Sequence, residues 1–217
     1  MATVYFYRFK EFSEAEITEA LALVSKERQE KINRLKSHEK KCEVLAAGLL
    51  LRAVLCRMSG VENGQLEFSR LSNGKPILKG FFDICFSISH TTGAVALAVS
   101  DREVGIDVEY VRPVNVRISE KSMLPNEIEY IDDGENTYQR FMTVWTRKEA
   151  FVKKTGQGFG QGFKTFSVFG DEADAVFDTV YDGRYVISTA GAKGFTFIGS
   201  ERSSEIVDRF IMENLKL

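Results

Sequence analysis

Two carboxylates stand two positions apart in residues 105–109, which read GIDVE. The alternation of apolar and polar residues predicts a strand, and Asp107 and Glu109 should then project from the same face. Carboxylates about 7 Å apart along a strand suit a hard divalent cation. Mg²⁺ in particular uses one or two carboxylates and takes its other ligands from water and substrate phosphates. An edge strand that is polar on one side would show the same pattern, so both interpretations stay open.

A second group lies in residues 145–154, WTRKEAFVKK, where Glu149 and Lys153 are four positions apart. On a helix these two side chains share a face. Such a pair is also the commonest surface ion pair and stabilises a helix by only about 0.3–0.5 kcal/mol. Trp145, one turn earlier, is more typical of a core anchor than of a ligand-binding residue. Taken alone, this helix carries no specific chemistry.

A third group lies where residues 86–93, FSISHTTG, pass from a strand into a turn. The hydroxyl of Ser89, the imidazole of His90 and neighbouring backbone amides could together bind a phosphate. His90 is one of two histidines in the chain. A histidine in this position is also compatible with a purely structural role.

Basic residues form the fourth group. Most of them lie in the charged stretch 26–41, which includes Arg28, Lys31, Arg34 and Lys36. Arginine and lysine are the natural binders of phosphate, although a solvated helix face would have the same composition. Lys75 is more informative, because it stands in the turn Asn-Gly-Lys-Pro, whose Gly and Pro define the backbone.

The elements that must position these groups fall into two similar halves, each with one long helix and several strands. Helices are predicted at 13–25, 39–58, 125–131, 137–155 and 203–215. Strands are predicted at 3–9, 66–69, 84–89, 94–100, 104–109, 163–169, 185–189 and 195–199. This order predicts an α+β protein of two similar-sized lobes, residues 1–102 and 103–217.

Composition is that of an ordinary globular protein, with 217 residues, 44% of them hydrophobic and 28% charged. It excludes a disordered chain, a collagen and a disulfide scaffold. The net charge of −2 argues against a generic nucleic-acid coat or a polybasic membrane anchor. The balance conceals a segregation, because residues 26–41 carry +4 and residues 101–135 carry −6.

The cellular context is predicted from cysteines and targeting signals. Cys42, Cys56 and Cys85 are odd in number and widely spaced, which favours reduced thiols over a disulfide or a zinc site. The N-terminal residues lack a secretory pattern, and no apolar run approaches the roughly 20 residues of a membrane span. We therefore expect a cytoplasmic protein.

The turn NGKP, then FSISH, GIDVE and WTRKEAFVKKTGQG follow one another in this order between residues 73 and 158. This combination resembles the 4'-phosphopantetheinyl transferases, and most closely the two-lobed class that activates surfactin synthetase and similar carrier proteins. The match extends from about residue 26 to residue 169, and the length suits the two-lobed class rather than the shorter trimeric one. The resemblance implies a pseudo-dimeric fold with the active site between the lobes.

The resemblance also implies roles for the acidic residues and for Lys153. A magnesium ion would bridge the pyrophosphate of coenzyme A and the side chains of Asp107, Glu109 and Glu149. Glu149 would also be the catalytic base for the acceptor serine, directly or through a water, with Asp107 among the catalytic residues. Lys153 would lie by the phosphates and stabilise charge on the bridging oxygen.

Coenzyme A, the co-substrate, is implied to bind through the basic and hydroxyl groups. Arg28, Lys31, Ser89 and His90 would hold its 3'-phosphate, and Lys75 would lie near its adenine end.

One position departs from the family pattern, since relatives often carry a further basic residue where Val44 stands. Either Lys40 or Lys41 substitutes for it, or coenzyme A is held by one contact fewer.

The implied reaction transfers phosphopantetheine from coenzyme A to a serine of an apo acyl or peptidyl carrier protein and releases adenosine 3',5'-bisphosphate. Such carriers serve fatty-acid, polyketide, nonribosomal-peptide and lysine biosynthesis, and the sequence does not select among them. An acidic carrier would dock on basic or apolar residues, for which the candidates are Arg112, Arg117, Lys121, Met123 and Leu124. We expect a monomer that binds neither nucleic acid nor membrane.

Two alternatives belong to other functional classes. A non-catalytic module could bind coenzyme A or a carrier protein without turnover, and such a module would be expected to lose a carboxylate or Lys153. A magnesium-dependent nucleotide hydrolase could use the same carboxylates, and it would release phosphate with no acceptor present.

Overall fold

The computed structural model describes residues 1–115, 121–156, 162–170, 175–191 and 194–215. Strand β1 (Ala2–Arg8) is rich in β-branched and aromatic residues and lies inside the first sheet. It pairs antiparallel with β5 (Ala94–Ser100) and parallel with β9 (Phe195–Ile198). With β4 (Cys85–Thr91) beside β5, the strand order is β4-β5-β1-β9.

Alternation along β5 explains how this sheet packs on both faces. The Val and Leu side chains of AVALAVS lie in the core under the helices, whereas its Ala side chains lie in a second core shared with the other sheet. Because successive side chains point to opposite faces, one strand supplies both layers. The small alanines allow the two sheets to approach closely.

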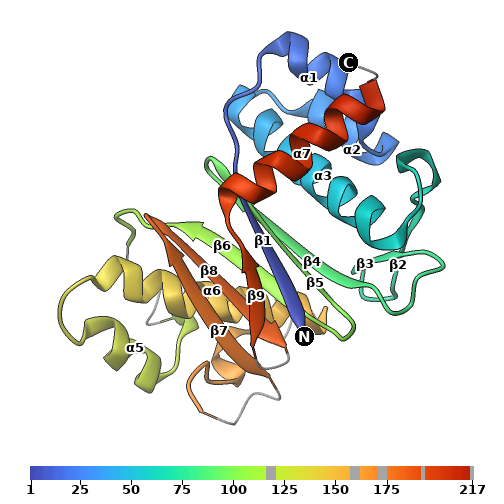
Figure 1. The fold of residues 1–217 in the computed structure, drawn as a ribbon. Helices are drawn as coiled ribbons and strands as arrows, with labels where there is room; N and C mark the ends of the chain where they lie inside the picture. The colour runs from blue at the N-terminus through green and yellow to red at the C-terminus, as the bar shows by residue number, and fades with distance from the viewer. Residues whose placement is uncertain (116–120, 157–161, 171–174, 192–193, 216–217) are drawn as a thin grey trace.

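Helices cover the outer face of the first sheet (Figure 1). The longest, α3 (His38–Ser59), is buried over most of its length and ends at Gly60, whose φ of 72° suits glycine. The other helical segments near this sheet are α1 (Glu14–Ala20), η1 (Leu21–Leu23), α2 (Lys26–Arg34), η2 (Asn63–Gln65) and α7 (Ser200–Leu215). A short hairpin, β2 (Phe68–Arg70) and β3 (Pro76–Leu78), projects beside them.

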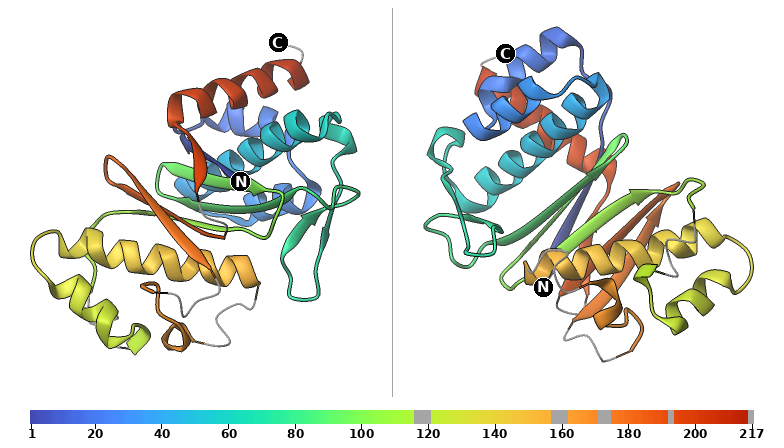
Figure 2. Two further views of the ribbon diagram at one scale, coloured as in Figure 1. Left: turned by 60° about the horizontal axis from the view of Figure 1, so that its bottom comes forward. Right: turned by 180° about the vertical axis from the view of Figure 1, so that it is seen from behind.

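The second sheet has the order β6-β8-β7 and is antiparallel throughout. Its strands are β6 (Gly105–Tyr110), β7 (Val176–Asp182) and β8 (Tyr185–Gly191). Helix α6 (Thr137–Thr155) lies along its outer face, with α5 (Pro125–Asp132) beyond (Figure 2). A third apolar cluster fills the space between α6, α5 and this sheet.

Most predicted elements are confirmed, and two match at both ends, β5 at 94–100 and α6 at 137–155. The mixed α+β class is also confirmed. Residues 195–215, placed by the predicted division in the second lobe, lie instead with the first sheet, because β9 pairs with β1 and α7 packs on α3. Strand β7 was not predicted, and it fills the edge of the second sheet.

The strand predicted at 163–169 is wrong, since the segment begins with the short helix η4 (Phe163–Thr165) and continues without regular structure. Its backbone groups bond to side chains instead of to a neighbouring strand. Lys148 Nζ donates to the carbonyls of Phe163 and Phe166 at 2.6 and 2.7 Å, and Glu127 Oε1 accepts the amide of Val168 at 2.9 Å. Because these backbone groups already have hydrogen-bond partners, the segment does not need to pair with a strand.

The three cysteines are free thiols, as the sequence predicted. Within the ranges that the structure describes, no helix is long and apolar enough to cross a membrane.

Candidate active site

Strands β4 and β6 bring hydroxyls to carboxylates where the two sheets meet. Ser89 donates a hydrogen bond to Asp107 at 2.7 Å, and Thr91 donates to Glu109 at 3.3 Å. The offset of 18 residues is the same in both pairs, so two side chains on one face of β4 face two on one face of β6. The prediction that Asp107 and Glu109 share a face of a strand is therefore confirmed.

Asp107 is the best buried of these groups, with 4% of its surface exposed. Its Oδ1 accepts hydrogen bonds from Ser89 and from Lys153 Nζ, the latter at 2.6 Å, and the same ammonium also donates to Ser89 at 2.8 Å. Its Oδ2 is buried and has no hydrogen-bond partner in the described part of the chain. A buried carboxylate oxygen without a partner is costly, and a cation beside it would remove the cost.

Helix α6 brings Glu149 and Lys153 to the strand carboxylates. The pKa of Glu149 is raised to about 7, chiefly by burial and then by the charge of Asp107, with a smaller contribution from Glu109 and an opposing one from Lys153. The pKa of Glu109 is also raised, mainly by burial and to a smaller extent by the negative charge of Asp107. The three carboxylates therefore lie close enough to repel one another, which a divalent cation would relieve. In the part of the chain that the structure describes, no three acidic, His or Cys side chains already form a metal cage.

Gly105 allows α6 to lie this close to β6. A Cβ at this position would stand 1.8 Å from the carbonyl oxygen of Ala150 and 2.6 Å from the amide nitrogen of Lys154. Both contacts are with backbone, which cannot turn aside as a long side chain can. The glycine thus sets the distance between the strand that carries Asp107 and the helix that carries Glu149.

Gly105→Ala is expected to destabilise the protein by about 1–3 kcal/mol or more, because the added methyl forces backbone apart. It should also lower activity by separating Glu149 from Asp107. Thermal unfolding and transfer assays would measure the two effects. Gly64→Ala is the matched control, since a Cβ there meets nothing within 4 Å. Equal melting temperatures for the two variants would contradict the close approach.

His90 points to the opposite face of β4 from Ser89. Its Nδ1 lies 3.3 Å from an oxygen of Glu43, a carboxylate on α3 that is only 1% exposed. Lys40 donates to both oxygens of Glu43 at 2.7 and 2.8 Å. Neighbours on a strand alternate in direction, so the structure does not bring Ser89 and His90 into one group as the sequence predicted. Each belongs to a different cluster.

A cavity of about 400 Å³ lies between α2, α3 and the β2–β3 hairpin. Arg28 and Lys31 are among its lining residues, and their charges lower the pKa of His90 after the larger effect of burial. The guanidinium of Arg28 also donates to the carbonyl of Val44 at 3.0 Å. The lining further includes Glu27, Arg52, Phe68, Arg70, Pro76 and Phe86. Four basic groups against one acidic group, with aromatic walls, suit an anion that carries a ring.

The NGKP turn docks on the end of α6. Lys75 Nζ donates to the carbonyls of Lys154 at 2.8 Å and Val104 at 3.4 Å, and Asn73 donates to the carbonyl of Thr155 at 3.3 Å. The contacts with Lys154 and Thr155 satisfy carbonyls that the end of α6 leaves without partners in the helix. Lys75 thus ties the β2–β3 hairpin to α6 and to the residue before β6, a contact that the sequence pattern did not indicate.

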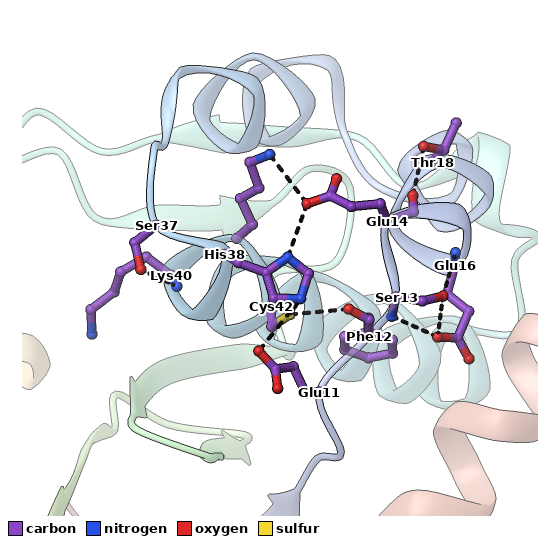
Figure 3. Close-up of polar contacts among 11 residues, drawn as sticks. Glu11, Phe12, Ser13, Glu14, Glu16, Thr18, Ser37, His38, Lys40 and Cys42 are labelled. Atoms are coloured by element: carbon purple, nitrogen blue, oxygen red, sulfur yellow. Dashed lines mark hydrogen bonds and ion pairs between the residues drawn. The ribbon is translucent and has the colours of Figure 1, made fainter.

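The two lysines considered as substitutes at position 44 differ in their surroundings. Val44 itself is buried in the core. Lys41 lies 3.7 Å from Glu14, which also contacts His38 at 3.0 Å, and Figure 3 shows Lys40 pointing away from this group. Through Glu43, Lys40 is joined to His90, so it is the lysine nearer to the predicted phosphate ligands.

The proposed docking residues are only partly available. Arg112 and Lys121 are exposed, and the charge of Arg112 lowers the pKa of Glu109. Met123 is 1% exposed and packs in the third apolar cluster, so the prediction that it lies on the surface is wrong. Leu124 is half-buried, and Arg117 lies outside the described residues.

Sequence reasoning missed Lys148 and Glu127, both wholly buried and joined at 2.8 Å. Burial lowers the pKa of Lys148, while Glu127 opposes the effect. The sequence did contain an indication of this pair, because Lys148 stands four positions after Val144 and therefore on the apolar face of α6. A charged residue at such a position needs a buried partner.

A larger cavity, about 770 Å³, lies between α3 and α7, away from Asp107. Its lining includes three arginines and three glutamates, and this balance gives no preference for a phosphate group.

Two family models match the chain. Residues 11–102 match the family described as 4'-phosphopantetheinyl transferase, N-terminal, and residues 103–192 match the 4'-phosphopantetheinyl transferase superfamily. The chain is 28% identical to the 4'-phosphopantetheinyl transferase Sfp of Bacillus subtilis over 166 residues, 75% of this chain and 73% of the relative.

Two further relatives come from other organisms. The chain is 33% identical to the 4'-phosphopantetheinyl transferase HetI of Nostoc over 156 residues, 68% of this chain and 66% of the relative. It is 30% identical to the 4'-phosphopantetheinyl transferase pptA of Paxillus involutus over 183 residues, 73% of this chain and 69% of the relative. The two family matches meet at residues 102 and 103, and the second ends before β9.

Proposed function

The chain belongs to the 4'-phosphopantetheinyl transferase superfamily, and we propose that it moves phosphopantetheine from coenzyme A to a serine hydroxyl of an apo acyl or peptidyl carrier protein. The observation that carries this proposal is the meeting of Asp107, Glu149 and Lys153 from two different elements. In the reaction the serine oxygen bonds to the phosphorus nearest pantetheine, the bond to the bridging oxygen breaks, and adenosine 3',5'-bisphosphate leaves.

Mg²⁺ fits the residues present. The buried, unpartnered Oδ2 of Asp107 and the raised pKa values of Glu109 and Glu149 are what a cation would satisfy. These three carboxylates would hold it, as hard oxygen ligands suit magnesium. When bound, the ion supplies positive charge to the pyrophosphate oxygens.

Glu149 and Lys153 have the properties that the transfer needs. With its pKa raised to about 7, Glu149 can accept the proton of the serine hydroxyl near neutral pH and later release it. Lys153 presents an ammonium beside Asp107 and would stabilise charge that develops on the bridging oxygen. Little covalent work falls to the protein in phosphoryl transfer, so positioning and charge account for most of the rate.

The nucleotide end of coenzyme A would lie on the first lobe. Arg28, Lys31 and His90 surround one region next to the cavity under the hairpin, and they would hold the 3'-phosphate. Ser89, on the other face of β4, would contact the phosphates beside Lys153 instead. Lys75 would lie near the adenine. The active site would then lie between the two lobes of one monomer.

The acidic carrier would dock beside Glu109, where Arg112 is exposed. A non-catalytic binding module is not favoured, because Asp107, Glu109, Glu149 and Lys153 are all present and lie together. The alternative, a magnesium-dependent nucleotide hydrolase, would act on the nucleotide with no carrier protein present.

We expect each apo carrier that the enzyme accepts to gain the mass of one phosphopantetheine when it is incubated with the protein, coenzyme A and Mg²⁺. Mass spectrometry of carriers from fatty-acid, polyketide and peptide synthesis would measure the gain and identify the accepted class. Carriers with the acceptor serine changed to alanine are the control. Release of adenosine 3',5'-bisphosphate without any carrier gaining mass would favour a hydrolase and contradict the proposal.

A further inference from the structure

Glu43 is a buried carboxylate that the reaction described above does not use. Only 1% of its surface is exposed, Lys40 holds both of its oxygens, and one oxygen also lies 3.3 Å from His90 Nδ1. A buried charge is tolerated only where it is paired and hydrogen-bonded. This one joins helix α3 to strand β4 beside the cavity lined by Arg28 and Lys31.

The contact fixes the chemistry of the imidazole. An ionised carboxylate only accepts hydrogen bonds, so His90 must carry a hydrogen on Nδ1. The ring is then held in one orientation, and Nε2, for which the described residues provide no partner, is the nitrogen available to a ligand.

The charges around His90 decide which ligand Nε2 can bind. From α2 come the cations Arg28 and Lys31, from α3 comes Glu43 with Lys40, and the β5 residue paired with His90 is the apolar Val95. Burial and the two cations lower the pKa of His90, whereas Glu43 raises it. A neutral ring offers a lone pair at Nε2, which phosphate oxygens cannot use. A protonated ring offers an N–H.

We propose that Glu43 is a positioning residue that makes the enzyme selective for nucleotides carrying a 3'-phosphate, by orienting His90 and supplying the counter-charge for its protonated form. Lys40 neutralises the rest of the carboxylate, so that Glu43 does not repel the phosphate. The inference rests on the proposed function, since that function places the 3'-phosphate of coenzyme A at His90. It adds a residue on α3 that makes no contact with the nucleotide.

The test compares adenosine 3',5'-bisphosphate with adenosine 5'-monophosphate, which lacks the 3'-phosphate. Calorimetry on the full chain would give the ratio of the two dissociation constants. Glu43→Gln keeps the shape of the side chain and is expected to lower the preference for the bisphosphate about 10-fold or more, the range of one charge-assisted hydrogen bond. A merely structural role would weaken both nucleotides equally and leave the ratio unchanged.

Glu14→Gln is the matched control, because Glu14 also joins a histidine and a lysine but is exposed (Figure 3). Its ratio should equal that of the unchanged protein. Combining Glu43→Gln with His90→Ala should lower the ratio no further than His90→Ala alone, since both act on the same contact.

A pH series provides the second measurement. In the unchanged protein the preference for the bisphosphate should fall as pH rises, because fewer His90 rings can be protonated. In Glu43→Gln that fall should begin at lower pH, since the counter-charge is gone.

An unchanged or larger ratio in Glu43→Gln overturns the inference. A protein that binds the two nucleotides with the expected preference but modifies no carrier would overturn the proposed function instead.

Discussion

Asp107→Ala is expected to lower phosphopantetheine transfer by about 10³-fold or more while the fold stays intact. Removing this carboxylate deletes a hydrogen-bond acceptor of Lys153 and a ligand that the proposed metal needs. Electrostatic groups placed where charge develops commonly contribute factors of about 10²–10³ each, and here two are lost together. Single-turnover transfer to an apo carrier, followed by mass spectrometry, would measure the loss.

Asp101→Ala is the matched control for this variant. Asp101 is an exposed carboxylate six positions earlier, which in the described part of the chain contacts the N-terminal ammonium and the hydroxyl of Ser100. Its activity should stay within about two-fold of the unchanged protein, as expected of a surface substitution. Near-normal activity in Asp107→Ala would show that the metal and the lysine are held elsewhere.

The same cluster predicts a pH dependence of metal binding. The pKa of Glu149, raised to about 7, lies above its ordinary value of 4.5, so the group is largely protonated below pH 7 and ionised above it. Protons and Mg²⁺ then compete for the carboxylates, and magnesium affinity should fall by up to about ten-fold for each pH unit below 7. Calorimetric titration with Mg²⁺ at pH 6 and pH 8 would measure it. Glu149→Gln should bind Mg²⁺ more weakly and lose most of this pH dependence.

The local part of this site could be predicted from the sequence. Alternation in GIDVE correctly gave a strand with Asp107 and Glu109 on one face, because side-chain direction in a strand depends only on position. The end of α6 could be predicted from Gly156, where φ is 68°. These are short-range effects, and one stretch of chain is enough to specify them.

The meeting of strand and helix could not be predicted from spacing. Glu149 reaches Asp107 only because Gly105 lets α6 lie against β6, and nothing in the pattern of α6 identifies that glycine as its partner. The pairing of β9 with β1, nearly the whole chain apart, is likewise a long-range contact. Ser89 and His90 were predicted to form one site because they are neighbours in the sequence. Neighbouring side chains on a strand point to opposite faces of the sheet, so the two residues lie apart.

Lys148→Met is expected to lower the free energy of unfolding by about 3–5 kcal/mol, the usual cost of removing one partner from a buried ion pair. The variant leaves Glu127 charged and wholly buried, and it leaves the carbonyls of Phe163 and Phe166 without the ammonium that bonds them. For a chain of this size each kcal/mol corresponds to about 2–4 °C in melting temperature. Thermal unfolding should therefore show a loss of about 6–20 °C.

The large loss of stability is expected because the Lys148–Glu127 pair is buried, and not because its two charges are unusually close. Lys79 and Glu67 form an ion pair at 2.9 Å, nearly the same separation as Lys148 and Glu127, but both side chains are exposed. Solvent screens such a pair, so Lys79→Met should leave the melting temperature unchanged within error.

Glu127→Gln provides the other half of a double-mutant cycle. The backbone amides of Leu124 and Val168 donate to different oxygens of Glu127, so the single carbonyl oxygen of glutamine can accept only one of them, and glutamine cannot neutralise Lys148. If the pair acts as a unit, the double variant with Lys148→Met should be less destabilised than the two single effects added together. If the two changes in the free energy of unfolding simply add, the pair does not act as a unit. The ammonium of Lys148 would then matter only for its bonds to the two carbonyls, and the charge of Glu127 would not help to hold residues 163–168 against α6.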